Sequence, residues 1–273
     1  MKIFRFLALA LIVTSFASCF STAKDVKSDS KPFPHDTYDT LLKKHVDEDG
    51  WVDYEGFIAD SVQFNKYLAL LSANHPNKKN WSEDERLAYW INAYNAFTIQ
   101  LIIDNYPIGS IKDIKNGIPF VSTVWDISFI KIEGIEYDLN NIEHNIIRQK
   151  FEEPRIHAAV ICASRSCPQL RNEAFTAARL DEQLEDEMRR FVNEPTRNKI
   201  TANKGELSKI FTWYKGDFTK NGSLIEFINK FSTNELNSNA EITFLDYGWG
   251  LNVQNWEEKK ATLEAASAEK AGK

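Results

Sequence analysis

The sequence predicts a helix-rich α+β fold, a single domain built around a small mixed or antiparallel sheet. Three observations support this prediction. Helical patterns outnumber strand-like runs along the chain. The two kinds of element do not alternate in the regular βαβ order that a doubly wound parallel sheet requires. The 273 residues are 43% hydrophobic and 12% aromatic, which is enough apolar material for one sizeable core.

The predicted elements of the first part are helices. Residues 38–46 and 54–71 each carry apolar side chains at helical spacing. Ser82 and Glu85 have the spacing of a capping box and predict the start of a helix that runs to about residue 105. This helix is apolar nearly all round, which is typical of a central helix packed on several sides.

The rest of the chain mixes strands and helices. Two strand-like runs around Glu133-Gly134 predict a β-hairpin over 127–132 and 135–139. Amphipathic spacing then predicts further helices, at residues 142–151, 180–192, 207–218 and 224–231. Residues 242–245 read as a late strand.

The first residues have the pattern of a secretory signal. Lys2 and Arg5 precede the apolar run 6–13, which is too short to span a bilayer. Cys19 closes a lipoprotein-like box and is the expected lipidation site, although Ser21-Thr22-Ala23 offers a competing cleavage site. We therefore expect an exported protein of the cell envelope that faces the periplasm or the exterior.

The remaining chain divides into three parts. Residues 20–36 are rich in Lys, Ser and Asp and are expected to form a flexible tether. Residues 37–254 are expected to form the globular domain, and residues 255–273 a polar, frayed tail. The sequence does not indicate an oligomeric state.

Charge restricts the partners. Without residues 1–19 the chain keeps 31 Lys and Arg against 39 Asp and Glu, a net charge of −8. A polyanion would be repelled and no basic stripe is present, which excludes nucleic acid. Membrane contact is expected only through a lipid on Cys19, and no pattern indicates a cofactor.

The segment around Cys167 carries the strongest chemical signal. Residues 156–162 read as a buried strand, so Cys167 would stand at a strand exit. Pro168 is favoured in the first turn of a helix. A thiol at the positive end of a helix has a lowered pKa and can act as a nucleophile.

A cysteine nucleophile needs a basic partner. His35 lies in the expected tether and His45 and His75 occur in polar turns, so all three are expected at the surface. His157 would be held roughly 20 Å from the strand exit if 156–162 were extended. His144 lies on a separate predicted helix and is the preferred partner of Cys167.

An orienting third group is sought among Asn92, Asn95 and Glu143. Asn92 and Asn95 lie three residues apart on one helix face and either orient a histidine or tie neighbouring loops together. Glu143 should point about 100° away from His144 on a regular helix, toward Arg148 or Arg155.

Three further side chains and two backbone groups complete the candidate site. Arg165 binds an anionic substrate or caps a structural network, and His157 and Arg155 are the other candidate substrate-binding residues. Backbone N–H groups of Ser166 and Cys167 could form an oxyanion hole if the turn presents them.

Other interpretations of the cysteines stay open. Cys162 and Cys167 have a C-x4-C spacing, which matches neither a thioredoxin-type motif nor a zinc ribbon. A structural or reversible disulfide, a zinc site with His144 and His157, and a purely structural buried thiol are the alternatives.

Several long motifs resemble the family called domain of unknown function 547. They are LAYWINAYNAFTIQLI, LNNIEHNIIR, PRIHAAVICASRSCPQLRNEAF, LDEQLEDEMRRFVN and LSKIFTWYKGDF, in order across roughly residues 87–231. The resemblance implies an envelope protein for signal-bearing bacterial members, and plant relatives carry the domain beside coiled coils. It implies no established activity.

From these residues we expect a thiol-dependent hydrolase or acyltransferase that acts on peptide-like amide bonds of a peptide or protein substrate. We hypothesise a similarity to papain-like or transglutaminase-like thiol hydrolases. The order of residues differs, because His144 precedes Cys167 here, whereas in those enzymes the cysteine comes first. The rival expectation is a non-catalytic envelope binding or scaffold module. Redox and zinc-binding functions are the remaining alternatives.

Overall fold

The computed structural model describes residues 26–115 and 123–272 of the chain. Within these residues the fold is helix-rich α+β, as predicted, and its strands form two small sheets. No helix in the described ranges is long and apolar enough to cross a membrane. The predicted signal at residues 1–19 and the lipidation site Cys19 lie outside the described residues.

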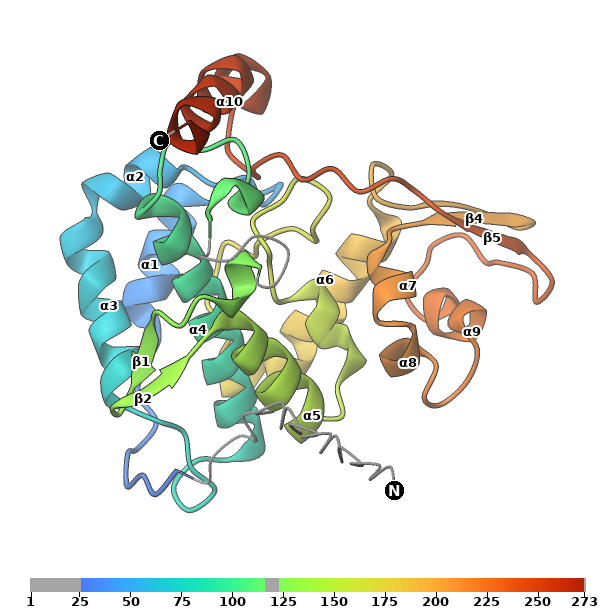
Figure 1. Ribbon diagram of the computed structural model, residues 1–273. Helices are drawn as coiled ribbons and strands as arrows, with labels where there is room; N and C mark the ends of the chain where they lie inside the picture. Colours follow the sequence, from blue (N-terminus) through green and yellow to red (C-terminus); the bar gives the residue numbers. More distant parts are fainter. Residues whose placement is uncertain (1–25, 116–122, 273) are drawn as a thin grey trace, which may run out of the picture.

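The first body of the fold is a helical layer around one central helix (Figure 1). Its elements are α1 (Asp36–His45), α2 (Tyr54–Ala59), α3 (Ser61–Ala73) and the central α4 (Glu83–Ile103). The predicted capping box is present: Ser82 Oγ accepts from Glu85 N–H, and the Glu85 carboxylate accepts from Ser82 N–H. Most residues of α4 are buried, which confirms its central position.

A hairpin and short helices follow α4. The predicted hairpin pairs β1 (Ile130–Ile132) with β2 (Ile135–Tyr137), and its turn residues Glu133 and Gly134 both have positive φ. Its flanks are short helical segments: η1 (Ile111–Asp113), η2 (Val124–Asp126), the π-helix η3 (Asn141–Ile147) and α5 (Arg148–Lys150). Farther along are η4 (Pro154–Ala158) and η5 (Ala177–Arg179).

The second body lies to the right in Figure 1 and contains a mixed sheet. In it β4 (Lys204–Leu207) pairs antiparallel with β3 (Lys199–Thr201) and parallel with β5 (Glu241–Phe244). The helices here are α6 (Leu180–Asn193), α7 (Ile210–Trp213), α8 (Lys215–Phe218) and α9 (Leu224–Asn229). Strands β3 and β4 were not predicted because these Lys-, Thr- and Gly-containing strands are too short for a hydrophobic period.

Two hydrophobic cores correspond to these two bodies. The first gathers apolar side chains of α1–α4, η3, the hairpin, the segment that contains Cys167 and the first half of α6. The second gathers those of the second half of α6, of α7–α9 and of the mixed sheet. The segment after η4 lies at the boundary, since Ala158 packs in the second core and its neighbour Ala159 in the first. The cysteines are therefore placed where the two cores meet.

The segment around the cysteines differs from the prediction. Residues 156–162 are not a strand: they begin in the 3-10 helix η4 and continue as an irregular buried turn. Their backbone forms hydrogen bonds with the side chain of Asn95 in α4 instead of with a neighbouring strand. No helix opens at Pro168, and residues 168–176 are irregular. A short apolar run is compatible with any buried conformation, so periodicity could not separate these cases.

Two predicted helices are divided. The helix predicted over 54–71 is α2 and α3, separated at Asp60. The helix predicted over 207–218 begins as the end of β4 and then forms α7 and α8, which meet at Tyr214. In both places short helices turn to bury side chains on different faces, which a single amphipathic pattern does not distinguish.

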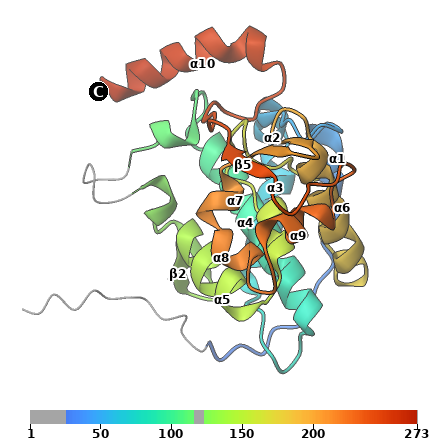
Figure 2. The same cartoon turned by 90° about the vertical axis from the view of Figure 1, so that its right-hand side faces the viewer.

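The ends of the described chain are more ordered than predicted. Residues 256–271 form helix α10 (Trp256–Ala271), which lies along one end of the molecule in Figures 1 and 2. Ser267 Oγ accepts from Gly109 N–H and donates to Asp113. Part of the predicted tether also docks, because the Ser30 carbonyl accepts bonds from Asn77, Asn80 and Trp81.

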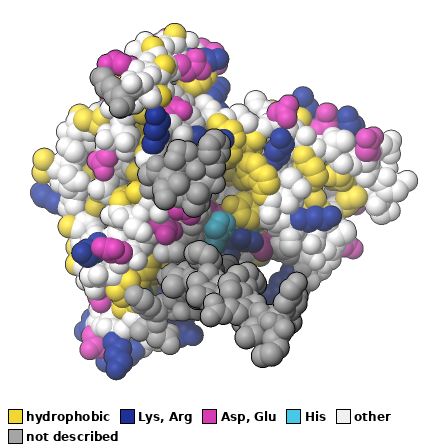
Figure 3. Space-filling view, in the orientation of Figure 1, with side chains coloured by type: hydrophobic (Ala, Val, Ile, Leu, Met, Phe, Trp, Pro, Cys, Tyr) yellow, Lys and Arg dark blue, Asp and Glu magenta, His cyan; other side chains and the backbone are white. Residues whose placement is uncertain are grey.

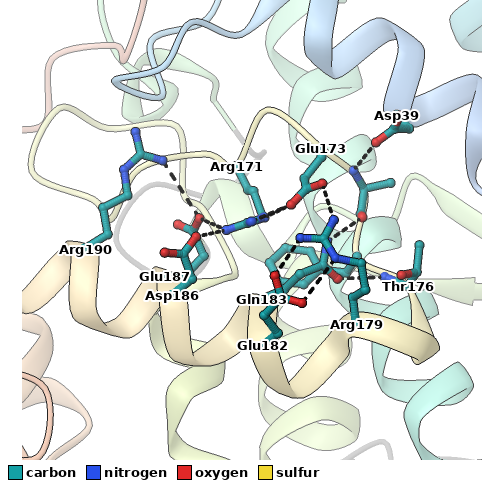
Figure 4. A network of polar contacts seen from close by, with 12 residues as sticks. Asp39, Arg171, Glu173, Thr176, Arg179, Glu182, Gln183, Asp186, Glu187 and Arg190 are labelled. Atoms are coloured by element: carbon teal, nitrogen blue, oxygen red, sulfur yellow. Dashed lines mark hydrogen bonds and ion pairs between the residues drawn. The ribbon is translucent and has the colours of Figure 1, made fainter.

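A network of charged side chains fixes α6 beside the segment that follows the cysteines (Figure 4). Arg171 donates to Glu173, to Asp186 and, over 2.7 Å, to Glu187. The Glu187 side chain is only 1% exposed. Burial raises the pKa of Glu187 to about 7, although the cation of Arg171 opposes this shift. Arg171 is therefore the cation that makes this buried carboxylate tolerable.

Candidate functional site

A cavity of about 370 Å³ opens where the two cores meet. Figure 3 shows hydrophobic side chains gathered at this junction, with a histidine beside them. The aromatic walls are Tyr94, Trp125, Trp213, Tyr214, Tyr247 and Trp249. The polar walls include Glu143, His144, His157, Cys162 and Cys167. A largely apolar hollow with a few convergent polar groups is the usual form of a small-molecule site.

A tightly held turn carries the two cysteines. Ala163, directly after Cys162, has φ of 58°, a left-handed conformation that costs an alanine roughly 1 kcal/mol or more. The turn keeps this conformation because residues 248–252 bond to it: Asn252 N–H donates to the Ala163 carbonyl, and Arg165 N–H donates to the Gly250 carbonyl. Strain of this kind is concentrated at functional sites.

The two thiols face each other in this turn. Cys162 Sγ and Cys167 Sγ are 3.2 Å apart, and Cys162 N–H donates to Cys167 Sγ over 3.1 Å. Both are free thiols. Cys162 Sγ also lies 3.2 Å from Ser164 Oγ and 3.3 Å from the Tyr247 hydroxyl. The neutral Cys162 thiol donates to Cys167 Sγ, whereas an ionised Cys162 can accept from the Cys167 thiol and from the two hydroxyls.

These surroundings shift the pKa values of the two thiols in opposite directions. Hydrogen bonds stabilise the ionised form of Cys162 and lower its pKa to about 7, although burial opposes this shift. The Cys167 thiol makes the largest contribution, and the hydroxyls of Ser164 and Tyr247 make smaller ones. Burial raises the pKa of Cys167 well above its usual range. Cys162, which is the less buried of the two, is therefore the better thiolate. The prediction favoured Cys167 because it assumed a helix start that is absent.

A π-helix places Glu143 and His144 on the same cavity wall. A π-helix turns less per residue than an α-helix, so adjacent side chains diverge less, and such bulges are frequent at functional sites. Glu143 is buried and accepts a 2.6 Å bond from the Tyr214 hydroxyl. Its carboxylate is 3.9 Å from His144 Nδ1. The expectation that Glu143 pairs with Arg148 or Arg155 is wrong, since both arginines bond to other carboxylates.

His144 is fixed in one hydrogen-bonding role. Arg148 Nη1 lies 3.1 Å from His144 Nδ1. A guanidinium can only donate, so Nδ1 accepts and the proton of the neutral ring is on Nε2. The side chain is 38% exposed. His144 therefore presents a donor, and the base that was predicted at this position is disfavoured.

His157 has the opposite arrangement. Its Nε2 is 2.7 Å from Asp217 Oδ2, and its ring stacks on Tyr214 with centroids 3.9 Å apart. Asp217 also binds Arg148. The bonds from His157 and then Arg148 hold the pKa of Asp217 well below its usual range. Burial lowers the pKa of His157. A neutral ring that donates from Nε2 has an acceptor at Nδ1, and this buried atom has no partner among the residues that the structure describes.

The structure brings His157 to the cysteines, a pairing that the prediction disfavoured. The estimate of roughly 20 Å assumed an extended strand. Because η4 and the following turn are compact, His157, Cys162 and Cys167 line one cavity. The surface positions predicted for His35, His45 and His75 are also wrong: all three are buried, and His35 bonds to Tyr67.

Asn92 and Asn95 tie loops together, the second of the two roles considered for them. Asn92 donates to the Phe175 carbonyl and accepts from Phe175 N–H. Asn95 donates to the Ala159 carbonyl and accepts from Ile161 N–H. Within residues 26–115 and 123–272, neither side chain is hydrogen-bonded to a histidine side chain. Asn95 nevertheless supports the site, since it holds the backbone just before Cys162.

The other predicted groups point elsewhere. Arg155 binds Glu153 and Asp181, and Arg165 lies over the rings of Trp51 and Trp256. Neither arginine lines the cavity. The expected oxyanion hole is not available, because Ser166 N–H donates to the Gly248 carbonyl and Cys167 N–H to the Ser164 carbonyl.

Several groups of the site were missed by sequence reasoning. Tyr214, Asp217 and Tyr247 bond the predicted residues, and Arg197 Nε donates to the Cys167 carbonyl over 2.6 Å. The aromatic-rich segments FTWYKGDF and YGWG were the available signal. Their aromatic side chains do not follow an amphipathic period, which is a sign that some of them line a cavity.

The zinc alternative has no support from side-chain geometry. Among residues 26–115 and 123–272, no group of three or more His, Cys, Asp and Glu side chains is arranged to hold a metal ion. His144, His157, Cys162 and Cys167 share a cavity without converging on one point as such a set would.

Comparison with known proteins gives one match. Residues 78–192 match the family described as "Protein of unknown function, DUF547". This match confirms the predicted resemblance. The search of curated proteins and the search of solved structures found no match. The matched range includes Glu143, His144, His157 and both cysteines, whereas the segments that carry Tyr214 and Tyr247 follow it.

Proposed function

Starting from the match of residues 78–192 to the DUF547 family, we propose that the cavity is a thiol-dependent hydrolase or acyltransferase site with Cys162 as nucleophile. The observation that carries this proposal is the Cys162 thiol at the cavity wall, whose Sγ lies within 3.3 Å of Cys167 Sγ, Ser164 Oγ and the Tyr247 hydroxyl. Hydrogen bonds from these groups lower the pKa of Cys162. A thiolate attacks carbonyl carbon readily. Peptide-like amides are the proposed substrates, and the aromatic walls suit their apolar parts.

Two histidines take different parts in the proposed reaction. His144 presents Nε2–H and would donate to the carbonyl oxygen as negative charge develops there. His157 has an unpartnered Nδ1 and an Asp217 carboxylate on its other nitrogen, which is the arrangement of an oriented base. The lowered pKa of His157 keeps this base neutral and ready to accept a proton.

The proposed reaction has an acylation stage and a deacylation stage. The Cys162 proton passes to His157 Nδ1, and the thiolate forms a bond to the carbonyl carbon. The carbon–nitrogen bond of the amide breaks, and the leaving amine takes the proton from His157. A water molecule, or an amine in a transferase, then attacks the thioester. It gives a proton to His157, and the departing Cys162 thiolate recovers that proton.

A non-catalytic binding module is the second candidate. The rings of Trp213, Tyr247 and Trp249 pack against one another along the cavity rim with centroids 4.7 to 6.0 Å apart, and Trp213 is 47% exposed. Exposed aromatic groups of this kind favour binding. A binding module would need the same aromatic rim but no reactive thiol. Acylation of Cys162 therefore distinguishes the two candidate functions.

The proposed base is tested with His157→Phe, which keeps a ring on Tyr214 but removes Nδ1. With p-nitrophenyl acetate as acyl probe, we expect deacylation to slow by about 10²-fold or more, because water loses its base. Acetyl-enzyme should therefore accumulate, which mass spectrometry of tryptic peptides detects. A residue with only a structural role would not cause an intermediate to build up.

His75→Phe is the matched control. His75 is also buried and bonds a tyrosine, Tyr137, but it does not line the cavity. We expect this variant to lose stability without accumulating acetyl-enzyme. Normal deacylation in folded His157→Phe, or accumulation in His144→Phe instead, would remove His157 from its proposed role.

A further inference from the structure

The arrangement of the two thiols has a consequence beyond acyl transfer. Their sulfur atoms are 3.2 Å apart, and a disulfide bond is about 2.05 Å long, so an approach of roughly 1 Å separates the dithiol from the disulfide. Both cysteines line the cavity, but Cys162 has intermediate exposure, whereas Cys167 is only 2% exposed. One thiol is thus open to a reagent in the cavity, and the second is within reach of the first.

We propose that Cys162 and Cys167 form a reversible disulfide whose oxidant is a small-molecule or peptide disulfide that enters the cavity. The surrounding structure holds both residues in place for this reaction. Asn95 fixes the backbone at Ile161, and Arg197 Nε donates to the Cys167 carbonyl. Closure therefore requires side-chain movement more than a rearrangement of the fold.

The chemistry is a two-step exchange. The Cys162 thiolate attacks one sulfur of the entering disulfide, forms a mixed disulfide and releases one thiolate. Cys167 then loses its proton to solvent, and its sulfur attacks Cys162 Sγ and releases the second thiolate. Two protein thiols are oxidised by two electrons, and the entering disulfide is reduced to two thiols. The nearby Arg197 cation favours the ionised form of Cys167 during the second step.

The disulfide would switch off the acyl-transfer reaction, because it occupies the Cys162 sulfur. This consequence rests on the proposed function, whereas the disulfide itself does not. The site would then act only where the compartment, or a reducing partner, keeps the pair reduced.

The test uses the full chain in mixtures of reduced and oxidised glutathione. Trypsin cleaves after Arg155, Arg165 and Arg171, so the two cysteines fall in separate peptides, 156–165 and 166–171. After alkylation of the remaining thiols and digestion without reduction, we expect the two peptides joined in oxidising mixtures. Dithiothreitol should separate them, and acetylation of Cys162 by p-nitrophenyl acetate should disappear and return in parallel.

Two variants establish the order of attack. Cys167→Ser lacks the second thiol, so a glutathione adduct on Cys162 should persist. In Cys162→Ser, the buried Cys167 should stay unmodified. The proposal is overturned if the wild-type peptides stay separate in every mixture, if a glutathione adduct on Cys162 is the end product in wild type, or if Cys167 reacts at the wild-type rate in Cys162→Ser.

The disulfide and the proposed function can fail separately. If the peptides join reversibly while p-nitrophenyl acetate never acylates Cys162, the disulfide is supported and the hydrolase or acyltransferase is contradicted. If Cys162 is acylated but the peptides never join, the disulfide is contradicted and the acyl-transfer proposal is unaffected.

Discussion

Replacement of Cys162 by serine is expected to reduce turnover of p-nitrophenyl acetate by about 10³-fold or more, because loss of the nucleophile removes the covalent route. In the wild-type protein the acetyl group should appear on tryptic peptide 156–165, which contains Cys162. A hydroxyl is close in size to a thiol, so the variant should keep its fold, as judged by its melting temperature and far-ultraviolet circular dichroism.

Cys167→Ser is the matched variant for this prediction. A serine hydroxyl at position 167 can still donate to the Cys162 thiolate, so the acetyl group should still appear on peptide 156–165. Acetylation found instead on peptide 166–171 would assign the nucleophile to Cys167. Full turnover in Cys162→Ser would show that neither the thiol nor this cavity performs the reaction.

Of the variants considered, Arg171→Met is expected to lose the most stability. Its free energy of unfolding should fall by about 3–5 kcal/mol at pH 8, because the buried Glu187 carboxylate loses its closest cation. The pKa of Glu187 in the fold, about 7, is above that of an unfolded glutamate, about 4.3. The folded state therefore holds this proton more tightly, and the contribution of the group to stability falls as the pH rises through 7. Removal of Arg171 raises this pKa further, so the deficit should widen from pH 5 to pH 8.

The measurement is urea unfolding of both proteins at pH 5 and pH 8, with Arg179→Met as the control. Arg179 belongs to the same network (Figure 4) and binds Glu173 and Glu182, but it is exposed. Its loss should leave the unfolding midpoint nearly unchanged at both pH values. A midpoint in Arg171→Met that is as insensitive to pH as that of the control would contradict the assigned role of Arg171.

The sequence predicted the elements whose signal is local. The capping box at Ser82 and Glu85, the Glu133-Gly134 turn and the amphipathic period of α6 each depend on residues within a few positions of one another. The sequence did not predict the structure of residues 156–176, because their backbone conformation is held by hydrogen bonds to residues far away in the sequence. Asn95 of α4 and the segment 248–252 bond to this region across the fold, and neither contact leaves a periodic trace in the sequence.

The sequence predicted which residues form the candidate site better than it predicted the chemical role of each residue. His144, His157, Glu143 and both cysteines were identified, and they line one cavity. Their roles depend on facts that spacing cannot contain. The π-helix turns Glu143 and His144 toward the same space, Arg148 determines which nitrogen of His144 accepts, and the turn at Ala163 brings two thiols into contact.

The most direct test of the account is the pH dependence of thiol alkylation in the folded protein. Iodoacetamide is applied over pH 5 to 10, and peptides 156–165 and 166–171 report Cys162 and Cys167 separately. We predict that Cys162 is alkylated first, with an apparent pKa close to 7, while Cys167 stays protected. Faster alkylation of Cys167, or a midpoint for Cys162 at the ordinary thiol value of about 8.5, would contradict the claim that Cys162 is the activated thiol of the cavity.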